Sequence, residues 1–587
     1  MTNTASAPVL PPRQTNLAEA RARHEAALSK RESIDDLHAL GLIDFEERRY
    51  GAAAEHLRRA IALAPTRPEL RNSLGVTLQA AGRLGEAISA YLDGLRLAPD
   101  FAELHLNVGG ALHLAGRLAD AAGHLAEAVR LKPHVADGYF NLGNVLRDQG
   151  RHDLAVTSYM QAVRLDPKAP APLTNLGDLY KRMGRSADAL TTLEQAVAVD
   201  PRSPEALICL GTLYHEMDRN EDAIRCYDMA QSVAPDMVEP WSNIGVSLQS
   251  EGRFDEALAA YDRAIAIKPK LAEPHMHRGM ALLTAGNYAE GWRAYEWRWR
   301  STAFDAQRRN FWQPRWTGQP IEGRTVLIYG EQGFGDMIQF VRYGRELQRL
   351  GARVVVETEP ELVRLFAGAD WAAQVLAKGT MLPPFDFHIP LLSLPHAFDT
   401  VVATVPAEVP YLVPPAALRE KWVARFADVT GLKIGLVWAG RPEHRRDHER
   451  SLSLDLLAPL GRVPGVRFFS LQVGSRADDI LSPRADFQVE SLGGFEDFAD
   501  TAAAITALDL VISVDTSVSH LTGALGRPNW VLLPAVPDWR WLLEREDCPW
   551  YPLTRLFRQP VPGDWRAVLA DLARELRQTA LLFNATL

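Results

Sequence analysis

Cysteine is scarce in this sequence. Only Cys209, Cys226 and Cys548 occur among 587 residues. Three cysteines without the spacing of zinc ligands provide neither a disulfide framework nor a metal site, and this is typical of proteins in a reducing compartment. We therefore expect a cytoplasmic location.

A secretory leader, a long apolar run and a basic surplus are also missing. The start, MTNTASAPVLPPRQ, lacks a basic segment followed by an apolar one. No apolar run approaches about 18 residues, so we expect no transmembrane helix. Lys and Arg number 64 against 73 Asp and Glu, which gives a net charge of −9. This balance disfavours nucleic acid as a partner.

The first half of the sequence is repetitive. Glycine recurs every 34 residues, at positions 41, 75, 109, 143, 177, 211, 245 and 279, and proline keeps the same step from Pro65 to Pro269. A small residue follows each glycine by twelve positions and a Leu or Tyr follows it by sixteen, as Ala87 and Tyr91 do. This resembles the tetratricopeptide repeat (TPR), a helical hairpin. Small residues let its two helices cross closely, proline ends the second helix, and we expect the large side chain to fill the gap to the next unit.

The repeats define the domain organisation of the first half. We expect a disordered segment 1–15, then a TPR superhelix over 16–305 with about eight repeats and a capping helix, then a connector 306–323. The segment YAEGWRAYEWRWR (288–300) closes the array with three tryptophans. An end helix of a solenoid must bury its outer face, so these aromatics indicate docking onto the next domain, with a simple capping helix as the alternative.

A row of asparagines runs through the repeats two positions before the glycine. Its members are Asn107, Asn141, Asn175 and Asn243. This position lies on the first helix of each hairpin, which lines the concave face of a TPR coil. Asparagine both donates and accepts, so the row can hold the backbone of an extended peptide. It resembles the asparagine ladder of the O-GlcNAc transferase superhelix, and the alternative is a set of hydrogen-bonded spacers between helices.

From residue 324 short apolar strands alternate with helices. RTVLIYG (324–330) and ARVVVETE (352–359) open one set, and LKIGLVWAG, VRFFSLQVG, LDLVISVD and NWVLLP form a second set after a proline-rich segment. Such alternation predicts parallel sheets covered on both faces. We expect two Rossmann-like lobes, 324–412 and 413–587. Ligands should bind beyond the carboxyl ends of the strands.

The first candidate site is the loop GEQGFGDMIQF, which follows the first strand. Gly333 and Gly335 let the backbone approach a ligand, and the Asp336 carboxylate can take the proton from an acceptor hydroxyl. The alternative role of Asp336 is to cap the helix. The spacing differs from the dinucleotide pattern GxGxxG, which excludes a nicotinamide enzyme.

The second candidate site is LVISVDTSVSHLTGALGRP (510–528), a strand that turns into a helix. Free amides at a helix start bind anions, so this turn is a candidate phosphate site. Its polar residues are Asp515, Thr516, Ser517, Ser519 and His520. The alternative is an ordinary capped helix with a histidine satisfied in the core.

The third candidate site is the loop WAGRPEHRRDHERS (438–451), which ends in Arg450 and Ser451. Guanidinium groups suit a diphosphate, whose negative charge grows as a sugar leaves. The acidic residues interleaved with the basic ones are more typical of a solvated loop.

Together these motifs resemble those of the heptosyltransferase-like glycosyltransferase family 9, over residues 324–575. The likeness is greatest to bacterial members that carry a TPR array. The resemblance implies a GT-B fold, inverting and metal-independent transfer, no cofactor, and a nucleotide sugar held by the second lobe. By position, Asp336 matches the family's base and Arg450 its phosphate contact. Asp515, Thr516 and His520 match its donor-binding motif.

The repeats indicate which acceptor such an enzyme would use. A peptide-binding coil joined to a transferase favours Ser or Thr of a protein acceptor held by the TPR groove. The combination is similar to O-GlcNAc transferase in design and, more closely, to the TPR-bearing flagellin glycosyltransferases, which makes flagellin the acceptor that we expect. Two alternatives stay open: a glycan or lipid acceptor, and a non-catalytic TPR scaffold or chaperone.

Overall fold

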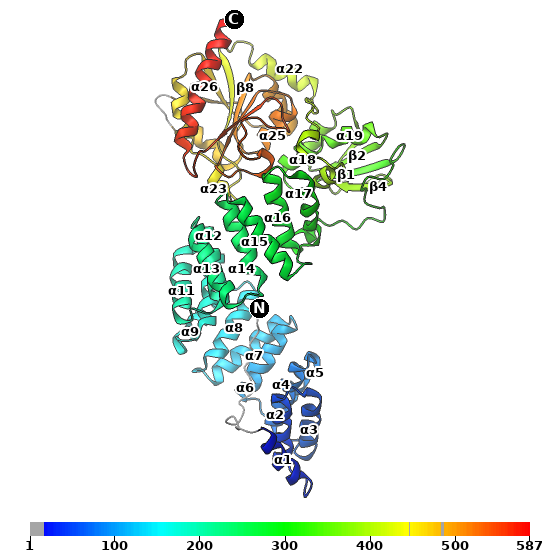
Figure 1. Ribbon diagram of the computed structural model, residues 1–587, viewed down its shortest axis with the longest axis vertical. Coiled ribbons are helices and arrows are strands. Elements are labelled where there is room, and N and C mark those ends of the chain that lie inside the picture. The colour runs from blue at the N-terminus through cyan, green and yellow to red at the C-terminus, as the bar shows by residue number, and fades with distance from the viewer. Residues whose placement is uncertain (1–16, 445, 483–486, 587) are drawn as a thin grey trace. The chain divides into compact units, whose positions relative to one another are not determined.

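A computed structural model describes residues 17–444, 446–482 and 487–586 (Figure 1). The predicted disordered segment 1–15 lies outside these residues, as does Arg445 of the basic loop. The chain divides into two compact units, residues 1–236 and 237–587.

The first unit is a series of antiparallel helical hairpins, as the 34-residue period predicts (Figure 1). Each hairpin takes one repeat, and the proline that follows the second helix lies just beyond its end. The series opens with α1 (Leu17–Leu28), which is shorter than the predicted capping helix over 16–31. The hairpin helices are α2 (Ile34–Glu46), α3 (Tyr50–Leu63), α4 (Pro68–Ala80), α5 (Leu84–Leu97), α6 (Ala102–Leu114), α7 (Leu118–Leu131), α8 (Ala136–Asp148), α9 (His152–Leu165), α10 (Pro170–Arg182), α11 (Ser186–Val199), α12 (Pro204–Glu216) and α13 (Asn220–Val233).

The repeated glycine marks where the two helices of one hairpin cross. A Cβ atom on Gly75 would lie 2.4 Å from the ring of Tyr91, and one on Gly143 would lie 2.6 Å from the ring of Tyr159. The large side chain therefore packs against the glycine of its own hairpin. A step of sixteen residues returns the chain to the same level of the partner helix. The large side chain also reaches the next unit, as expected, since the ring centre of Tyr261 lies 5.9 Å from that of His277 in the following hairpin.

An arginine precedes the second helix of most hairpins and pairs with an acid three residues later. In the first unit these pairs are Arg83–Glu86, Arg117–Asp120, Arg185–Asp188 and Arg219–Asp222, with Nε to carboxylate distances of 2.7 to 2.8 Å. The arginines are about half exposed. Such surface pairs contribute little to stability because water screens them.

The second unit begins with two further hairpins. Their helices are α14 (Val238–Ser250), α15 (Phe254–Ile267), α16 (Ala272–Thr284) and α17 (Tyr288–Tyr295), followed by the 3-10 turns η1 (Glu296–Arg300) and η2 (Thr302–Gln307). Tyr288 and Trp292 of α17 belong to the same apolar core as Trp539 and Trp550 of the sheet region. The Trp550 indole also donates to the Tyr288 hydroxyl at 3.0 Å. The predicted docking of the last repeat onto the next domain is therefore observed.

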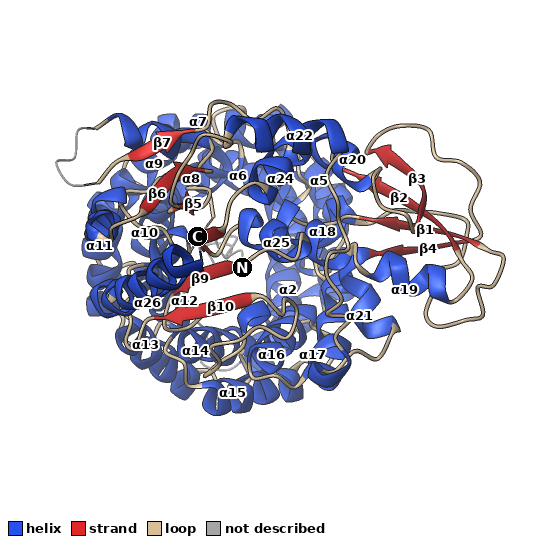
Figure 2. Cartoon of the chain, turned by 90° about the horizontal axis from the view of Figure 1, so that it is seen from above, coloured by secondary structure: helices blue, strands red, loops and turns tan. Residues whose placement is uncertain are grey.

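Two parallel sheets follow, and they stand apart as two groups of strands in Figure 2. The first has the order β3-β2-β1-β4. Its strands are β1 (Thr325–Tyr329), β2 (Arg353–Thr358), β3 (Ala372–Ala377) and β4 (Phe387–Pro390). Its helices and turns are α18 (Phe334–Phe340), α19 (Tyr343–Arg349), α20 (Pro360–Phe366), η3 (Leu391–Ser393), α21 (Leu394–Ala397) and η4 (Val402–Thr404).

The second sheet has the order β10-β9-β8-β5-β6-β7. Its strands are β5 (Leu432–Val437), β6 (Val466–Ser470), β7 (Val489–Ser491), β8 (Leu510–Val514), β9 (Asn529–Leu533) and β10 (Thr554–Arg558). Its helices and turns are α22 (Ala416–Arg425), α23 (Asp447–Arg450), η5 (Leu454–Arg462), η6 (Gly474–Leu481), α24 (Phe498–Thr506), α25 (Ser517–Ala524), η7 (Trp539–Trp541) and α26 (Trp565–Thr586). The predicted boundary between lobes, 412/413, falls between β4 and β5.

Parallel sheets are the fold class that the strand–helix alternation predicts, and they are observed. Four strands were not predicted: β3, β4, β7 and β10. All four lie at the edges of their sheets, and β4 and β7 are only four and three residues long, so their sequence signals are weaker than those of the central strands. Among the described residues, no helix is both long and apolar enough to cross a bilayer.

Candidate active site

The two sheets meet where the loop after β1 touches the turn after β8. A Cβ atom on Gly335 would lie 2.9 Å from Cδ2 of His520 and 3.7 Å from Cα of Ser517. Glycine is required at 335 because any side chain would enter the imidazole of the other loop. The structure thus brings the first two candidate sites together.

Asp336 lies in the first turn of α18, at the surface that faces the second sheet. Its Oδ2 accepts a hydrogen bond from the backbone N–H of Gly333 at 3.2 Å, so the carboxylate closes the glycine loop onto the helix start. Its Oδ1 pairs with the guanidinium of Arg540. The side chain is 13% exposed. Burial raises the pKa of Asp336, Arg540 opposes that rise, and the nearby Asp538 carboxylate adds to it.

Arg540 is a site residue that the sequence analysis missed. It lies in η7, beyond the carboxyl end of β9, and its Nη1 donates to Asp538 Oδ1 at 2.6 Å. Its guanidinium carbon lies 4.0 Å from the centre of the Trp539 ring. A polar residue beyond the carboxyl end of a predicted parallel strand was the available signal, because ligands of such sheets bind at that edge.

The turn after β8 directs several of its hydroxyl groups inward. Ser519 is fully buried and its hydroxyl donates to the Val514 carbonyl at 2.9 Å. The Thr516 hydroxyl lies 3.1 Å from that of Ser513. Ser519 therefore stabilises the turn in this structure and does not line the site, which corrects its assignment as a donor contact. The physical reason is that the third helical position faces the sheet.

Ser517 and Thr516 are partly exposed at the start of α25. The carboxylate of Asp515, also at this turn, is 14% exposed. Burial raises the pKa of Asp515 to about 6, and the neighbouring Asp538 acts in the same direction. The turn therefore presents backbone amides and one carboxyl group that titrates close to neutral pH.

His520 is a buried histidine with a full set of contacts. Its ring stacks on Trp541, with ring centres 5.1 Å apart, and its Nδ1 lies 3.0 Å from the Tyr551 hydroxyl. Its Nε2 is 4.0 Å from Oδ1 of Asp515. Burial, together with Arg540 and two other arginines, holds the pKa of His520 well below its ordinary value. The imidazole is therefore neutral at neutral pH, which suits a residue that lines the site and forms hydrogen bonds but carries no charge.

Arg450 joins the third candidate site to the second. Its Nη1 donates to the backbone carbonyl of Asp515 at 2.9 Å, and its Nε pairs with Asp447 at 3.1 Å. The Ser451 hydroxyl donates to Asp447 at 2.8 Å and accepts from the Gly440 N–H at 2.8 Å. The structure therefore places Arg450 at the turn after β8, and Ser451 is held next to Arg450 by its hydrogen bonds to Asp447 and Gly440.

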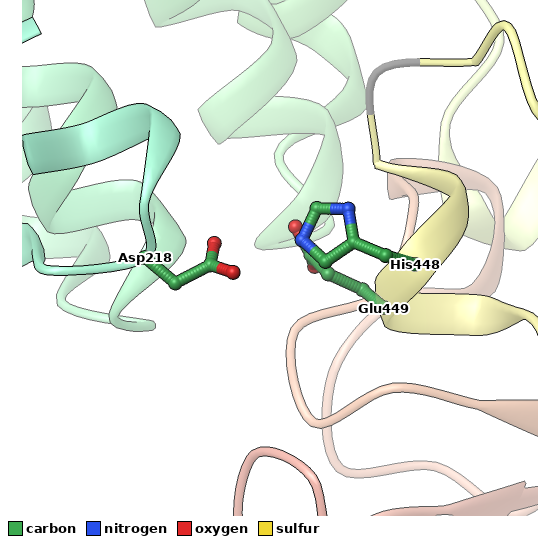
Figure 3. Close-up of side chains that lie close together, drawn as sticks. All are labelled: Asp218, His448 and Glu449. Carbon is green, nitrogen blue, oxygen red and sulfur yellow. The ribbon is translucent and has the colours of Figure 1, made fainter. Parts of the chain in front are cut away.

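An open cavity of about 460 Å³ adjoins this loop at the carboxyl ends of β5 and β6. Its lining includes His444, Ser451 and Arg476. Figure 3 shows His448 and Glu449 side by side on α23, and Glu449 is engaged by Arg446 of the same loop at 2.6 Å. The loop's mixed charges thus form local pairs, in agreement with a solvated loop, while Arg450 points to the turn.

The other end of the glycine loop is fixed by buried charges. Glu331 pairs with Arg298 of η1 at 2.9 Å, and both side chains are 0% exposed. Arg298 also pairs with Glu296 at 2.7 Å and donates to the Ser393 hydroxyl at 2.8 Å. Burial raises the pKa of Glu331 to about 7 against the opposing charge of Arg298. We call these four residues, Glu296, Arg298, Glu331 and Ser393, the loop anchor.

The asparagine row lies on the first helices of its hairpins, at Asn107, Asn141, Asn175 and Asn243. Two members contact asparagines of the preceding hairpin: Asn107 donates to Asn72 and Asn175 donates to Asn144, both at 2.8 Å. Asn107 is buried, whereas Asn141, Asn175 and Asn243 are partly exposed. The first unit thus uses part of the row as spacers between helices.

Comparisons with known proteins identify the repeats. The tetratricopeptide repeat family matches residues 38–100, 73–136 and 174–238, and further matches of this repeat cover residues 143–184 and 238–271. The chain contains TPR repeats, as predicted.

Protein FlbA of Caulobacter vibrioides is 27% identical to this chain over 310 residues, which are 49% of this chain and 52% of that protein. The chain thus spans about half the length of this relative. Solved structures with some likeness include YrrB, a TPR protein with an unusual peptide-binding site (21% identity, 32% of this chain, 96% of that chain, TM-score 0.28). Another is pilF of Pseudomonas aeruginosa (20% identity, 38% of this chain, 96% of that chain, TM-score 0.32).

Proposed function

We propose that this protein is an inverting, metal-independent glycosyltransferase of the GT-B type, which moves a sugar from a nucleotide sugar to Ser or Thr of a protein. One observation carries the proposal. A carboxylate at the edge of one parallel sheet, Asp336, confronts an amide-rich turn and arginines at the edge of a second parallel sheet. A general base and a diphosphate site must face each other in this way for a single displacement.

The proposed reaction assigns a role to each side of the junction. Asp336 accepts the proton of the acceptor hydroxyl, whose oxygen forms a bond to the anomeric carbon. The bond between that carbon and the phosphate oxygen breaks, and the nucleotide leaves with the electron pair, as a nucleoside diphosphate from an ADP- or UDP-sugar and as CMP from a CMP-sugar. The start of α25 and Arg450 stabilise the charge that develops on the phosphate. Burial of the site strengthens these electrostatic interactions.

The acceptor in this proposal is a protein chain held by the TPR repeats, which commonly bind extended peptides. Flagellin is the first acceptor to test, because TPR-bearing transferases similar in design modify flagellin. Two alternatives keep a specific basis. The heptosyltransferase-like motifs favour a glycan or lipid acceptor, and the ion pair that engages Asp336 favours a TPR scaffold without catalysis.

Nucleotide release from candidate nucleotide sugars tests the proposal. The wild-type protein should release nucleotide from at least one donor among ADP-, UDP- and CMP-linked sugars, with flagellin present. Asp336→Asn should lower the rate by about 100-fold or more, the usual contribution of a general base. The matched control is Asp370→Asn, since Asp370 is 87% exposed and precedes the amino end of β3, whereas the junction lies beyond the carboxyl end of β1. Equal rates in wild type and Asp336→Asn would remove Asp336 as the base, and no release from any donor would favour the scaffold.

A further inference from the structure

Arg540 lies at the junction of the two sheets, between the carboxylates of Asp336 and Asp538. Its side chain is 11% exposed, lies over the Trp539 ring, and pairs with Asp336 of one sheet and Asp538 of its own turn. Burial of a guanidinium is unfavourable unless carboxylates compensate it, and the two aspartates do so here. Arg540 is therefore held by anions on both sides of the junction.

The same contacts engage both oxygens of the proposed base. One oxygen of Asp336 accepts from Arg540 and the other accepts from the Gly333 N–H. A carboxylate with both oxygens engaged by donors is a poor proton acceptor, since a nearby positive charge favours its ionised form. Asp336 must lose the contact with Arg540 before it can take a proton from a hydroxyl.

A diphosphate offers Arg540 a competing partner at the same place. The planar guanidinium binds phosphate oxygens in pairs, as it binds carboxylates. A phosphate would bind at the turn that begins with Asp515. This turn lies next to Gly335, the residue that precedes Asp336 in the chain. Arg450 lies at the same turn, where it pairs with Asp447 and donates to the Asp515 carbonyl.

We propose that Arg540 is an exchangeable counter-ion: it pairs with Asp336 in the empty site and transfers to the diphosphate of the donor, which frees Asp336 to act as the base. This inference rests on the proposed function and adds to it the order of events, in which the donor binds before the acceptor hydroxyl is activated. The hydroxyl of the acceptor is activated only when a donor is in place. Arg540 would contact the leaving group directly, which makes it a second catalytic residue.

The exchange has a consequence for affinity that a purely structural ion pair lacks. Asp336 competes with the ligand for one guanidinium, so the apparent affinity for a diphosphate falls with the fraction of molecules in which Arg540 is free. Removing the negative charge of Asp336 should therefore tighten diphosphate binding, although it abolishes the proposed base.

Calorimetric titration of the full chain tests this with five probes: ADP, GDP, UDP, CDP and inorganic pyrophosphate. Asp336→Asn should bind the best of these probes about threefold or more tightly than wild type. Arg540→Ala should bind it at least about tenfold more weakly, as expected for loss of a charged hydrogen bond. The control is Arg545→Ala, which removes an exposed arginine paired with Asp547 in the same segment and should leave the affinity unchanged.

A double variant separates exchange from simple charge removal near a phosphate. In the Arg540→Ala background, Asp336→Asn should give no gain in affinity, because the guanidinium for which it competes is gone. An equal gain in both backgrounds overturns the inference, as does an Asp336→Asn protein that binds no tighter than wild type or a wild type that binds none of the probes. If the binding pattern holds while no donor sugar is transferred, the proposed function fails and the exchange stands. The Asp336→Asn result does not depend on whether Arg540→Ala folds.

Discussion

The repeats and the sheet junction use ion pairs in opposite ways. In the repeats, Arg83 and Glu86 are 45% and 53% exposed and lie three residues apart in the chain. At the loop anchor, Arg298 and Glu331 are both 0% exposed and lie 33 residues apart. Water screens the first pair, whereas the second must be satisfied by its own partners. Local pairs at the surface can change freely, while buried pairs between distant segments fix a geometry.

The substitution of Arg298 is the most direct test of this contrast between buried and exposed ion pairs. Arg298→Ala should lower the free energy of unfolding by about 3–5 kcal/mol, because it leaves Glu331 buried without its cation. All 14 tryptophans lie at or beyond position 241, so tryptophan fluorescence in urea reports the second unit alone. Arg253→Ala, which removes a partly exposed pair in the same unit, is the control. Similar losses in the two variants would contradict the contrast between buried and exposed pairs.

The pH dependence of stability sharpens the same comparison. The pKa of Glu331 is about 7 in the fold, above its ordinary value of 4.5, so the folded state favours the protonated form. The stability that this group contributes is complete below about pH 4.5 and is lost as the pH rises to about 7. Wild type should therefore lose stability relative to Glu331→Gln between pH 5 and 7, on the order of 3 kcal/mol, with no further change above that range.

Urea unfolding of both proteins at several pH values, followed by tryptophan fluorescence, checks this prediction. A difference between wild type and Glu331→Gln that is constant with pH would show that Glu331 does not titrate in this range. The control substitution Glu256→Gln, at an exposed position, should show no such dependence on pH between pH 5 and 7.

Packing inside a hairpin gives a smaller effect. Gly75→Ala would place a Cβ 2.4 Å from the Tyr91 ring, so it should destabilise the first unit by about 1–3 kcal/mol. Gly85 has no atom within 4 Å of the corresponding position, and Gly85→Ala should instead stabilise the unit by about 0.5–1 kcal/mol through helix propensity. Thermal unfolding followed by circular dichroism measures both. Two changes of the same sign would contradict the crossing of helices at Gly75.

The smallest effect is expected at the surface of the repeats. Arg83→Ala should change the free energy of unfolding by about 1 kcal/mol or less, because its partner Glu86 keeps its hydration when the pair is lost. The same circular dichroism experiment measures this change in the free energy of unfolding. The change should be smaller still in high salt, because salt screens the exposed pair. A loss as large as that of Arg298→Ala would remove the distinction between the two kinds of pair.

The repeats and the central strands could be predicted from the sequence because their signals are local and periodic. The glycine step of 34 defines every hairpin, and apolar runs such as that of β8 mark buried strands. The ladder role of Asn107 could not be judged from spacing, since its hydrogen bond to Asn72 depends on how neighbouring hairpins stack.

The junction was predicted only in part. Strand–turn–helix patterns identified Asp336 and the turn at Asp515, because ligands of parallel sheets bind at that edge. Arg540 is 204 residues from Asp336 in the chain, and its pairing depends on how the two sheets are brought together. The inward direction of the Ser519 hydroxyl likewise depends on a helical position that the motif alone does not fix.

The sharing of one apolar core by α17 and the sheets limits how the protein can be divided. Tyr288 and Trp292 supply part of the core that also contains Trp539 and Trp550. A truncated protein that begins at 306 would expose this apolar surface to water. It would also lose Arg298, the partner of Glu331 in the glycine loop. A fragment for crystallisation or assay should begin near 237 instead, so whole repeats can be removed only upstream of that point.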